Sequence, residues 1–345
     1  MTSLRVVLAG LGVRGTYWAE VLTRSPRSEI AAYVDPDPAA RARAAARFGD
    51  RPAFAAVEDA LSALPGVDAL VLANPPVGRE SQVRAALDRG MPMLIEKPLA
   101  LSLDEAAHLV SLAEAVGVPL MVGLNFRYLA VTRQVMALLA QKTVGQPEFA
   151  RFTYERYRDG HRPDLNKYPL TMAHPMLWEQ SIHHFDLMRF VYGRDPVIIQ
   201  CHTWNPTWSV YAGDANVAAI ITFEGGLVVN YQGTWQANWN TPHFEWRTEC
   251  SEGIITQRDQ FGDLYVARRD DPALTPVALP PHETWITETI GLWEAFERAA
   301  ANGAALECSG RDHLGSLAML EACIRSSREQ CGVAVADLLP HPIGS

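Results

Sequence analysis

Three side chains that can hold or exchange a proton stand at helical spacing in the segment LWEQSIHHFDLMRF, residues 177–190. Glu179 and His183 are four residues apart and His183 and Asp186 three apart, so on a helix they share one face. Imidazole has an ordinary pKa near neutrality, which suits general acid–base catalysis. The same spacing could form an ion pair on a solvated face, or could hold a zinc or iron ion. The rest of the chain must decide among these three interpretations.

Length and composition narrow the class of protein. The chain has 345 residues, enough for two or three domains. A hydrophobic content of 48% and a charged content of 20% are typical of a soluble globular protein. The net charge of −9, without basic runs, argues against nucleic acid as a partner. The sequence shows no signal peptide and no apolar run long enough to cross a membrane. Five widely spaced cysteines without a C-x-x-C pair favour reduced thiols in the cytoplasm.

A glycine motif follows the first apolar run of the chain. Residues 4–9 read as a short strand, residues 10–15 as GLGVRG, and the chain then takes a helical pattern. In this context G-x-G-x-x-G indicates a dinucleotide site. Gly10 permits the tight turn, Gly12 lets the backbone approach a pyrophosphate, and Gly15 lets helix and strand pack closely. Val13 and Arg14 complete the turn, and the helix N-terminus offers N–H groups to the phosphates.

The second predicted strand ends in an acidic residue. Asp35 stands twenty residues after Gly15, where a carboxylate can accept both hydroxyls of the adenosine ribose. A carboxylate there would repel a 2′-phosphate, so NAD is predicted rather than NADP. Arg14 and Arg41 could still accept a phosphate, and a solvated turn residue before Pro36 is the alternative interpretation of Asp35.

Three further apolar runs alternate with helical stretches, at residues 67–76, 91–100 and 118–128. This alternation predicts parallel βαβ units with a sheet covered on both faces. Ligands of such sheets lie beyond the carboxyl ends of the strands. The residues expected along that rim, beside the dinucleotide, are Asn74, Pro75, Glu96, Lys97 and Asn125. Lys97 comes directly after a buried strand and before Pro98, so it could be functional or could simply reach solvent.

These motifs together resemble the glucose-fructose oxidoreductase, inositol dehydrogenase and rhizopine-catabolism (Gfo/Idh/MocA) family. The resemblance covers nearly the whole chain and rests on six segments in the family's order: GLGVRG, VDPD, ANPP, EKPLA, GLNFRY and EQSIHHFD. It implies that Lys97 and His183 are catalytic and that Glu179 completes the set. It also implies a cis peptide bond between Lys97 and Pro98, and no metal.

Two departures from the family pattern affect the predicted site. Many members have aspartate where Glu179 stands, and the longer side chain moves the carboxylate by about one carbon–carbon bond. Many members also have histidine a few residues after the T-P-P turn, where this chain has Arg79 in NPPVGRES. The second departure puts the cofactor contacts of this turn in doubt, although not cofactor binding itself.

The second half of the chain changes pattern. After a helix near residues 130–141, six segments alternate with a period of two, which predicts a large, open, mostly antiparallel sheet. Two helical stretches, near residues 284–301 and 311–330, close the chain. The predicted fold is an α/β protein. It has a Rossmann domain with a doubly wound parallel sheet over residues 1–124 and an α+β substrate and oligomerisation domain over residues 125–345. The C-terminal helices could pack back on the first domain.

A polar, proline-rich segment over residues 156–180 leads directly into the helix of His183. Loops of this length are uncommon unless they are functional, so it is interpreted as a substrate loop, with an ordinary surface excursion as the alternative. The predicted substrate contacts are Lys97, Arg156, Arg162, Tyr168, Glu179, His183 and Asp186, with Asp186 as either a contact or an anchor behind the site.

The sequence therefore predicts an NAD(H)-dependent dehydrogenase acting on the secondary alcohol or ketone of a sugar, polyol or inositol. His183 is the expected acid–base group, and Lys97 the expected donor to the alkoxide. The alternatives are a glycosidase that uses NAD for transient oxidation and a regulator that binds NAD or sugar without turnover. The resemblance implies a homodimer or homotetramer formed through the second sheet.

Overall fold

The computed structural model describes residues 3–339 and divides the chain into two compact units. The first unit contains residues up to Asn125 and the segment Glu283–Leu314, and the second contains Phe126–His282 and Gly315–Leu339. Against the expected division after residue 124, Asn125 and a late segment of the chain thus fall in the first unit. No helix among residues 3–339 has the length and apolar content that crossing a membrane requires.

The first unit is built on a six-stranded parallel sheet with the order β3-β2-β1-β4-β5-β6. Its strands are β1 (Leu4–Ala9), β2 (Ser28–Val34), β3 (Ala53–Phe54), β4 (Ala69–Leu72), β5 (Met93–Ile95) and β6 (Leu120–Val122). The strand order reverses between β1 and β4, which is where a doubly wound sheet binds its ligand. The predicted Rossmann sheet is confirmed.

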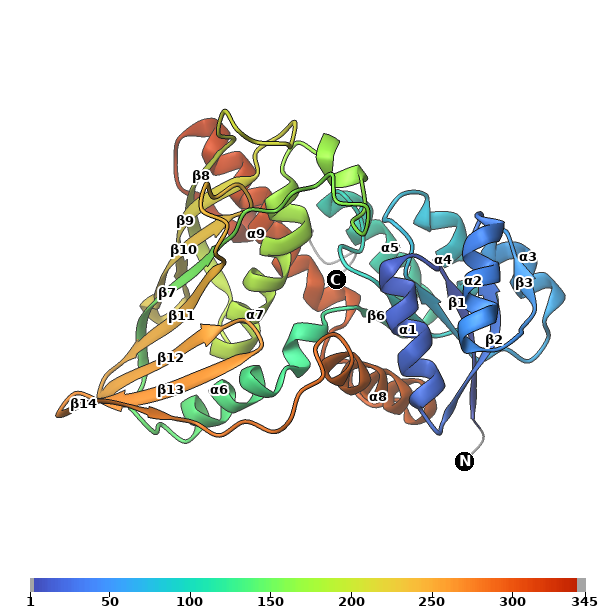
Figure 1. The fold of residues 1–345 in the computed structure, drawn as a ribbon, viewed down its shortest axis with the longest axis horizontal. Helices are drawn as coiled ribbons and strands as arrows, with labels where there is room; N and C mark the ends of the chain where they lie inside the picture. Colours follow the sequence, from blue (N-terminus) through green and yellow to red (C-terminus); the bar gives the residue numbers. More distant parts are fainter. Residues whose placement is uncertain (1–2, 340–345) are drawn as a thin grey trace. The chain divides into compact units, whose positions relative to one another are not determined.

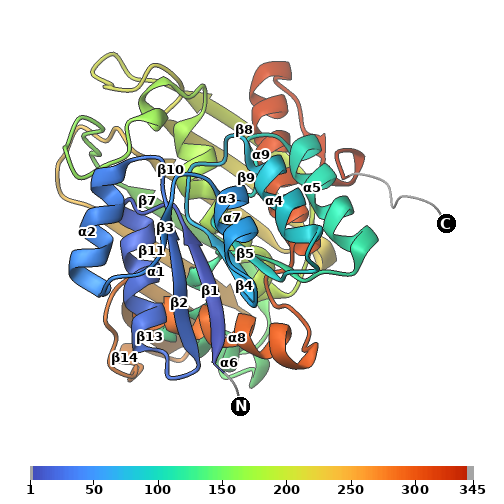
Figure 2. The ribbon, with the colours of Figure 1, turned by 90° about the vertical axis from the view of Figure 1, so that its right-hand side faces the viewer.

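Helices cover both faces of this sheet (Figure 2). They are α1 (Val13–Arg24), α2 (Pro38–Phe48), α3 (Val57–Ala63), α4 (Arg79–Leu87) and α5 (Leu103–Val116). In Figure 2, α1 and α2 lie on one side, and α3, α4 and α5 on the other. The late helix α8 (Thr287–Asn302) packs against α1. The indoles of Trp293 and Trp18 meet there edge to face, with ring centroids 6.3 Å apart. Because both faces of the sheet are covered, all four residues of β4 are buried, and its sequence, ALVL, is entirely apolar.

The second unit is built on a nine-stranded sheet with the order β14-β13-β12-β11-β7-β10-β9-β8-β15. Its strands are β7 (Pro147–Glu155), β8 (Pro196–Trp204), β9 (Asn216–Phe223), β10 (Val228–Thr234), β11 (His243–Cys250), β12 (Gly253–Asp259), β13 (Gly262–Arg268), β14 (Asp271–Pro276) and β15 (Val333–Ala334). All neighbouring pairs are antiparallel except β7 and β10, which are parallel. The predicted large, mostly antiparallel sheet is confirmed.

Helices cover one face of the nine-stranded sheet (Figure 1). This unit contains α6 (Ala130–Ala140), α7 (Ile182–Tyr192) and most of α9 (Gly310–Glu329). Short helical turns are η1 (Asn125–Tyr128), η2 (Tyr168–Thr171), η3 (Leu177–Ser181), η4 (Glu224–Gly226) and η5 (Val335–Asp337). Strand β9 shows the effect of one-sided cover, because Val217, Ala219, Ile221 and Phe223 are buried while Ile220 is 48% exposed.

Candidate active site

The glycine turn between β1 and α1 is shaped by contacts that exclude side chains. A Cβ on Gly15 would lie 1.8 Å from the carbonyl oxygen of Gly10, and one on Gly10 would lie 2.4 Å from the backbone nitrogen of Asn74. A Cβ on Gly12 would meet no atom within 4 Å. Open space in front of the N-terminus of α1 is what a pyrophosphate needs. The glycine turn therefore fits a dinucleotide.

Asp35 lies at the end of β2 and is tied to this turn. Its carboxylate accepts hydrogen bonds from the backbone N–H groups of Leu11 at 2.7 Å and Asp37 at 2.8 Å. Each carboxylate oxygen has a further lone pair for a ribose hydroxyl. The guanidinium of Arg41 donates to the carbonyl oxygens of Asp35 and Pro36, so a cation stands at the backbone of this position.

Arg14 and Glu96, both expected at the cofactor, pair with each other. The Nε of Arg14 donates to the Glu96 carboxylate at 2.6 Å, and the indole N–H of Trp18 donates to the same oxygen at 2.7 Å. Glu96 is only 6% exposed, and Gly123 provides room for its carboxylate. The pair fixes α1 against the end of β5. Asn125 is also buried, and its amide donates to Glu288.

Arg79, which stands near the position where the resemblance implies a frequent histidine, holds the backbone around Lys97. The Arg79 side chain is 1% exposed. Its Nη1 donates to the carbonyl oxygens of Glu96, Pro98 and Leu99 at 2.8, 2.5 and 3.0 Å, and its Nη2 donates to that of Asn74 at 2.8 Å. The peptide bond between Lys97 and Pro98 is cis, as the resemblance implies. Lys97 itself is half-buried, so its side chain extends from a backbone that is fixed on both sides.

We expect Arg79→Met to destabilise the first unit strongly. The substitution removes the donor to four carbonyl groups, and each buried group left without a partner costs about 1–3 kcal/mol. The expected loss is about 3 kcal/mol or more, seen as an unfolding midpoint lowered by roughly 5 °C or more in calorimetry. Arg84→Met is the matched control, because Arg84 is on the same helix but is half-exposed and paired with Glu80. Equal midpoints for the two variants would contradict this assignment.

In the second unit, the segment that carries Glu179 and His183 begins with a π-helical turn. Residues Leu177–Ser181 form this turn, and the α-helix α7 follows directly from Ile182. Glu179 thus lies in the π turn and His183 in the α-helix, so simple α-helical spacing does not describe their relation. Single π turns inside helices occur frequently at functional sites.

Glu179 and His183 are both held by aromatic neighbours. The hydroxyl of Tyr168, in η2, donates to the Glu179 carboxylate at 2.6 Å. The imidazole of His183 stacks on the ring of Phe126, with centroids 4.3 Å apart and planes 23° apart. His183 is 7% exposed. Such stacking restricts the orientation of the imidazole, which a proton-transfer group requires.

His184 plays a different part from His183, as its rotation around the helix predicts. It is fully buried between Gln180 and the hydroxyl of Tyr231, at 3.0 and 2.9 Å. Burial lowers the pKa of His184 to about 3, because the imidazolium would lose its hydration. His184 is therefore a neutral packing residue throughout the physiological range.

Asp186 anchors the helix to the segment GLNFRY. Its carboxylate accepts two hydrogen bonds from the guanidinium of Arg127, at 2.7 and 2.5 Å, and a third from Ser316 at 3.2 Å. Arg127 and Asp186 are 3% and 1% exposed. This buried pair corresponds to the anchoring role considered for Asp186. Among residues 3–339, His, Cys, Asp and Glu side chains form no group of three that could hold a metal ion.

The two predicted arginine contacts of the substrate loop differ in their surroundings. Arg162 is exposed and pairs with Asp164 at 2.6 Å. Arg156 is half-buried at the end of β7, and its Nη1 donates to the hydroxyl of Tyr154. The structure thus places Arg156, Tyr168, Glu179 and His183 in the second unit, together with Asp186 in its ion pair with Arg127. It separately gathers Gly10, Arg14, Asp35, Asn74 and Glu96 in the first unit.

In a comparison with known protein families, two segments of this chain match family models. Residues 4–124 match an oxidoreductase family with an NAD-binding Rossmann fold, and residues 132–256 match the Gfo/Idh/MocA C-terminal domain. Inositol 2-dehydrogenase 1 of Paenarthrobacter aurescens is 30% identical over 74% of this chain and 73% of that protein. D-apiose dehydrogenase of Paraburkholderia graminis is 28% identical over 90% and 84%.

A solved structure shows the same fold. An oxidoreductase from Agrobacterium radiobacter, in complex with NAD⁺, L-tartaric acid and magnesium, superposes with a TM-score of 0.89. The alignment covers 98% of this chain and 100% of that one at 21% identity. This likeness concerns the fold of the chain, and its ligands belong to that protein.

Proposed function

We propose that this chain, which belongs to the Gfo/Idh/MocA family of NAD-binding oxidoreductases, transfers hydride between NAD and the secondary alcohol or ketone of a sugar, polyol or inositol-like substrate. Its membership confirms the resemblance and makes it a dehydrogenase. The observation that carries the proposal is His183, which is nearly buried, oriented by Phe126 and accompanied by Glu179 on one helical segment.

The residues of the first unit would hold the cofactor. Gly10, Gly12, Val13 and Gly15 would take the pyrophosphate at the start of α1, and Asp35 the adenosine ribose. Asn74 and Pro75 would line the rim, while Arg14, Glu96 and Asn125 would support it through the contacts described above. When bound, NAD accepts or returns the hydride.

In the proposed reaction, His183 removes the hydroxyl proton of the substrate during oxidation and returns it during reduction. Tyr168 holds Glu179, whose charge would stabilise the imidazolium that forms. Lys97 would donate to the developing alkoxide, where charge grows in the transition state. Arg156 and Tyr168 remain the proposed substrate contacts from the loop. Arg162 would reach a substrate only by leaving Asp164.

A substrate panel tests this function directly. Sugars and inositols are offered with NAD or NADP, and reduced nicotinamide is followed by its absorbance. We expect turnover of at least one secondary alcohol, and loss of that turnover in Lys97→Ala. Glycoside cleavage without net NADH would instead indicate redox-assisted hydrolysis, and NAD binding without any turnover would indicate a regulator.

We propose NAD rather than NADP as the cofactor, because the Asp35 carboxylate would repel a 2′-phosphate. Asp35→Ser is expected to shift the ratio of kcat/KM for NADP over NAD by about tenfold or more, since Arg41 stands beside this position and can accept the phosphate. Asp37→Ser is the control, because Asp37 caps α2 through the N–H of Ala39 and serine caps equally well. An unchanged cofactor ratio in Asp35→Ser would contradict the assignment.

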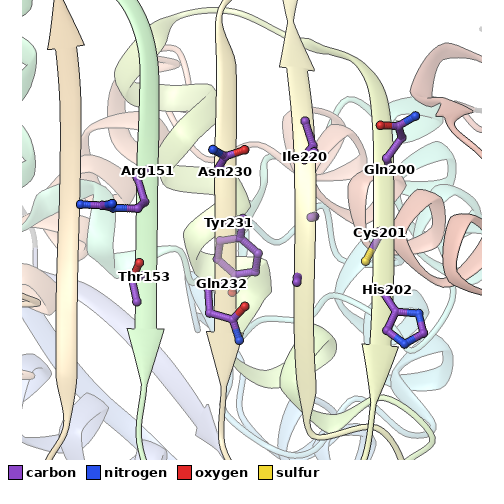
Figure 3. Close-up of a pocket in the computed structure, with 11 residues that line it drawn as sticks. Arg151, Thr153, Gln200, Cys201, His202, Ile220, Asn230, Tyr231 and Gln232 are labelled. Carbon is purple, nitrogen blue, oxygen red and sulfur yellow. The ribbon is translucent and has the colours of Figure 1, made fainter.

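We also propose a homodimer or homotetramer formed through the uncovered face of the nine-stranded sheet. Phe149, Val197, Ile198 and Ile220 are between 38% and 55% exposed in this sheet. Figure 3 views a shallow hollow of about 500 Å³ on this face, where Ile220 lies among polar side chains that include Gln200, Asn230 and Arg151. Light scattering should give a dimer or tetramer mass, and Ile220→Lys should lower it. A monomeric mass for the unaltered protein would contradict the proposal.

A further inference from the structure

Two arginines extend from the end of β7 toward the covered face of the nine-stranded sheet. The backbone N–H groups of Arg156 and Arg158 donate to the carbonyl oxygens of Thr234 and Trp235, at 2.9 and 2.7 Å, and an isolated antiparallel bridge joins Tyr157 to Gln236 beyond the end of β7. Arg156 reaches the hydroxyl of Tyr154, which is 6% exposed beneath α7, and Arg158 lies on the ring of Trp235, which is 1% exposed, so both side chains are on the buried side.

Within residues 3–339, no carboxylate forms an ion pair with Arg156 or Arg158. Their neighbours on the same stretch of chain differ, because Arg151 pairs with Glu245 at 2.8 Å and Arg162 with Asp164 at 2.6 Å. Both unpaired arginines are half-buried. Charge that is partly desolvated without a counterion is unfavourable, which makes this place attractive to an anion.

The hydrogen bonding of Arg156 is incomplete. Its Nη1 donates to the hydroxyl of Tyr154 at a long 3.3 Å, and its Nε is buried without an acceptor. The Tyr154 hydroxyl in turn donates to the amide oxygen of Gln180 at 3.4 Å. Gln180 follows Glu179 in the π turn. The Arg156 guanidinium is thus connected, through one phenol, to the helical segment that carries Glu179 and His183.

Arg158 lies on an aromatic surface beside a third donor. Its guanidinium carbon is 4.0 Å from the ring centroid of Trp235, and the ring of Tyr211 is 5.5 Å from that of Trp235. Burial raises the pKa of the Tyr211 hydroxyl, although Arg158 and Arg156 partly oppose this. The hydroxyl therefore keeps its proton. Two guanidiniums and a phenol make the site rich in donors.

We propose that Arg156 and Arg158 bind a carboxylate of the substrate, so that the enzyme acts on an acidic sugar or polyol, an aldonate or uronate, rather than on a neutral one. Guanidiniums match a planar carboxylate in charge and geometry. This inference rests on the proposed hydride transfer and deepens it. Hydride transfer itself takes place at a secondary alcohol carbon of the substrate, and the carboxylate remains unchanged.

The test compares acids with their neutral counterparts in the presence of NAD. D-gluconate is paired with D-glucitol, D-glucuronate with D-glucose and D-galacturonate with D-galactose, and glucose 6-phosphate is added as a sugar with another anion. In at least one pair, we expect kcat/KM for the acid to be about tenfold or more higher than kcat/KM for its neutral partner. In Arg156→Met this value should fall about 100-fold for the acid, chiefly through KM, and less than about threefold for the neutral partner.

Arg325→Met controls for the loss of one positive charge, because Arg325 is an exposed residue of α9 paired with Glu329. It should leave both values unchanged. Equal use of acid and neutral partner, equal losses for both in Arg156→Met, or preference for the phosphate would overturn the inference. If nothing is oxidised, the proposed hydride transfer fails, and calorimetric titration of the NADH-loaded protein with D-glucarate decides the anion site. Binding that Arg156→Met abolishes supports the site, and absence of binding overturns it.

Discussion

Replacing His183 by asparagine is expected to lower kcat for alcohol oxidation by about 10²–10⁴-fold, the usual contribution of a positioned acid–base group. The amide is close to imidazole in width and can still pack against Phe126, but it cannot accept the hydroxyl proton. The fluorescence titration of NADH should be unchanged, because His183 belongs to the second unit and the glycine turn to the first. His108→Asn, at an exposed residue paired with Glu80, is the control.

The pH dependence of oxidation follows from the same role. A base must be neutral to accept a proton, so the rate should be full above the pKa of the imidazole and should fall as the pH drops through it. In His183→Asn the residual rate should lose this dependence. A wild-type rate with the same pH dependence as that of His183→Asn, or a variant within about threefold of wild type, would rule out His183 as the base.

Replacing Lys97 by methionine is expected to lower kcat by about 10²–10³-fold, the typical effect of removing one donor to a developing oxyanion. Methionine retains the length and apolar stem of lysine but not its charge. The effect should fall on kcat more than on KM, because the alkoxide carries its charge only in the transition state.

The backbone around Lys97 makes this a clean test. Arg79 holds the carbonyl groups on both sides of residue 97 whatever its side chain. The unfolding midpoint of Lys97→Met should therefore stay near that of the wild type, and Lys142→Met, at the exposed end of α6, should keep full activity. A variant with lost activity and an equally lowered midpoint would indicate a structural lysine instead.

The architecture of the first unit was predictable because its signals are local. Each buried strand is a short apolar run, each crossover is a helix, and right-handed crossovers then leave few orders for a parallel sheet. In the second sheet, the positions of the strands were predictable, but the pairs that the strands form were not. Alternation along β7 and β10 identifies two strands, yet nothing local specifies that they run parallel, since β8 and β9 intervene in the sequence.

The residues that contact the site residues could be identified only from the structure. The π turn at Glu179 leaves no mark in residue spacing, and Tyr168, Phe126 and Arg79 find their partners through the tertiary fold. One signal was present in the sequence. A carboxylate within the apolar helix of Asp186 demands a buried cation, but only the structure identifies that cation as Arg127 in GLNFRY, 59 residues away.

The order in which the chain is synthesised gives α8 a further importance. Trp18 lies near the start of the chain and is fully buried, but Trp293, which packs on it, is made 275 residues later. Glu297 of the same helix accepts hydrogen bonds from Ser25, Arg27 and Ser28, which connect α1 to β2. The nucleotide-binding unit therefore cannot finish folding until residues 283–314 have been made, and a nascent chain carries an uncovered indole surface at Trp18 until that segment emerges.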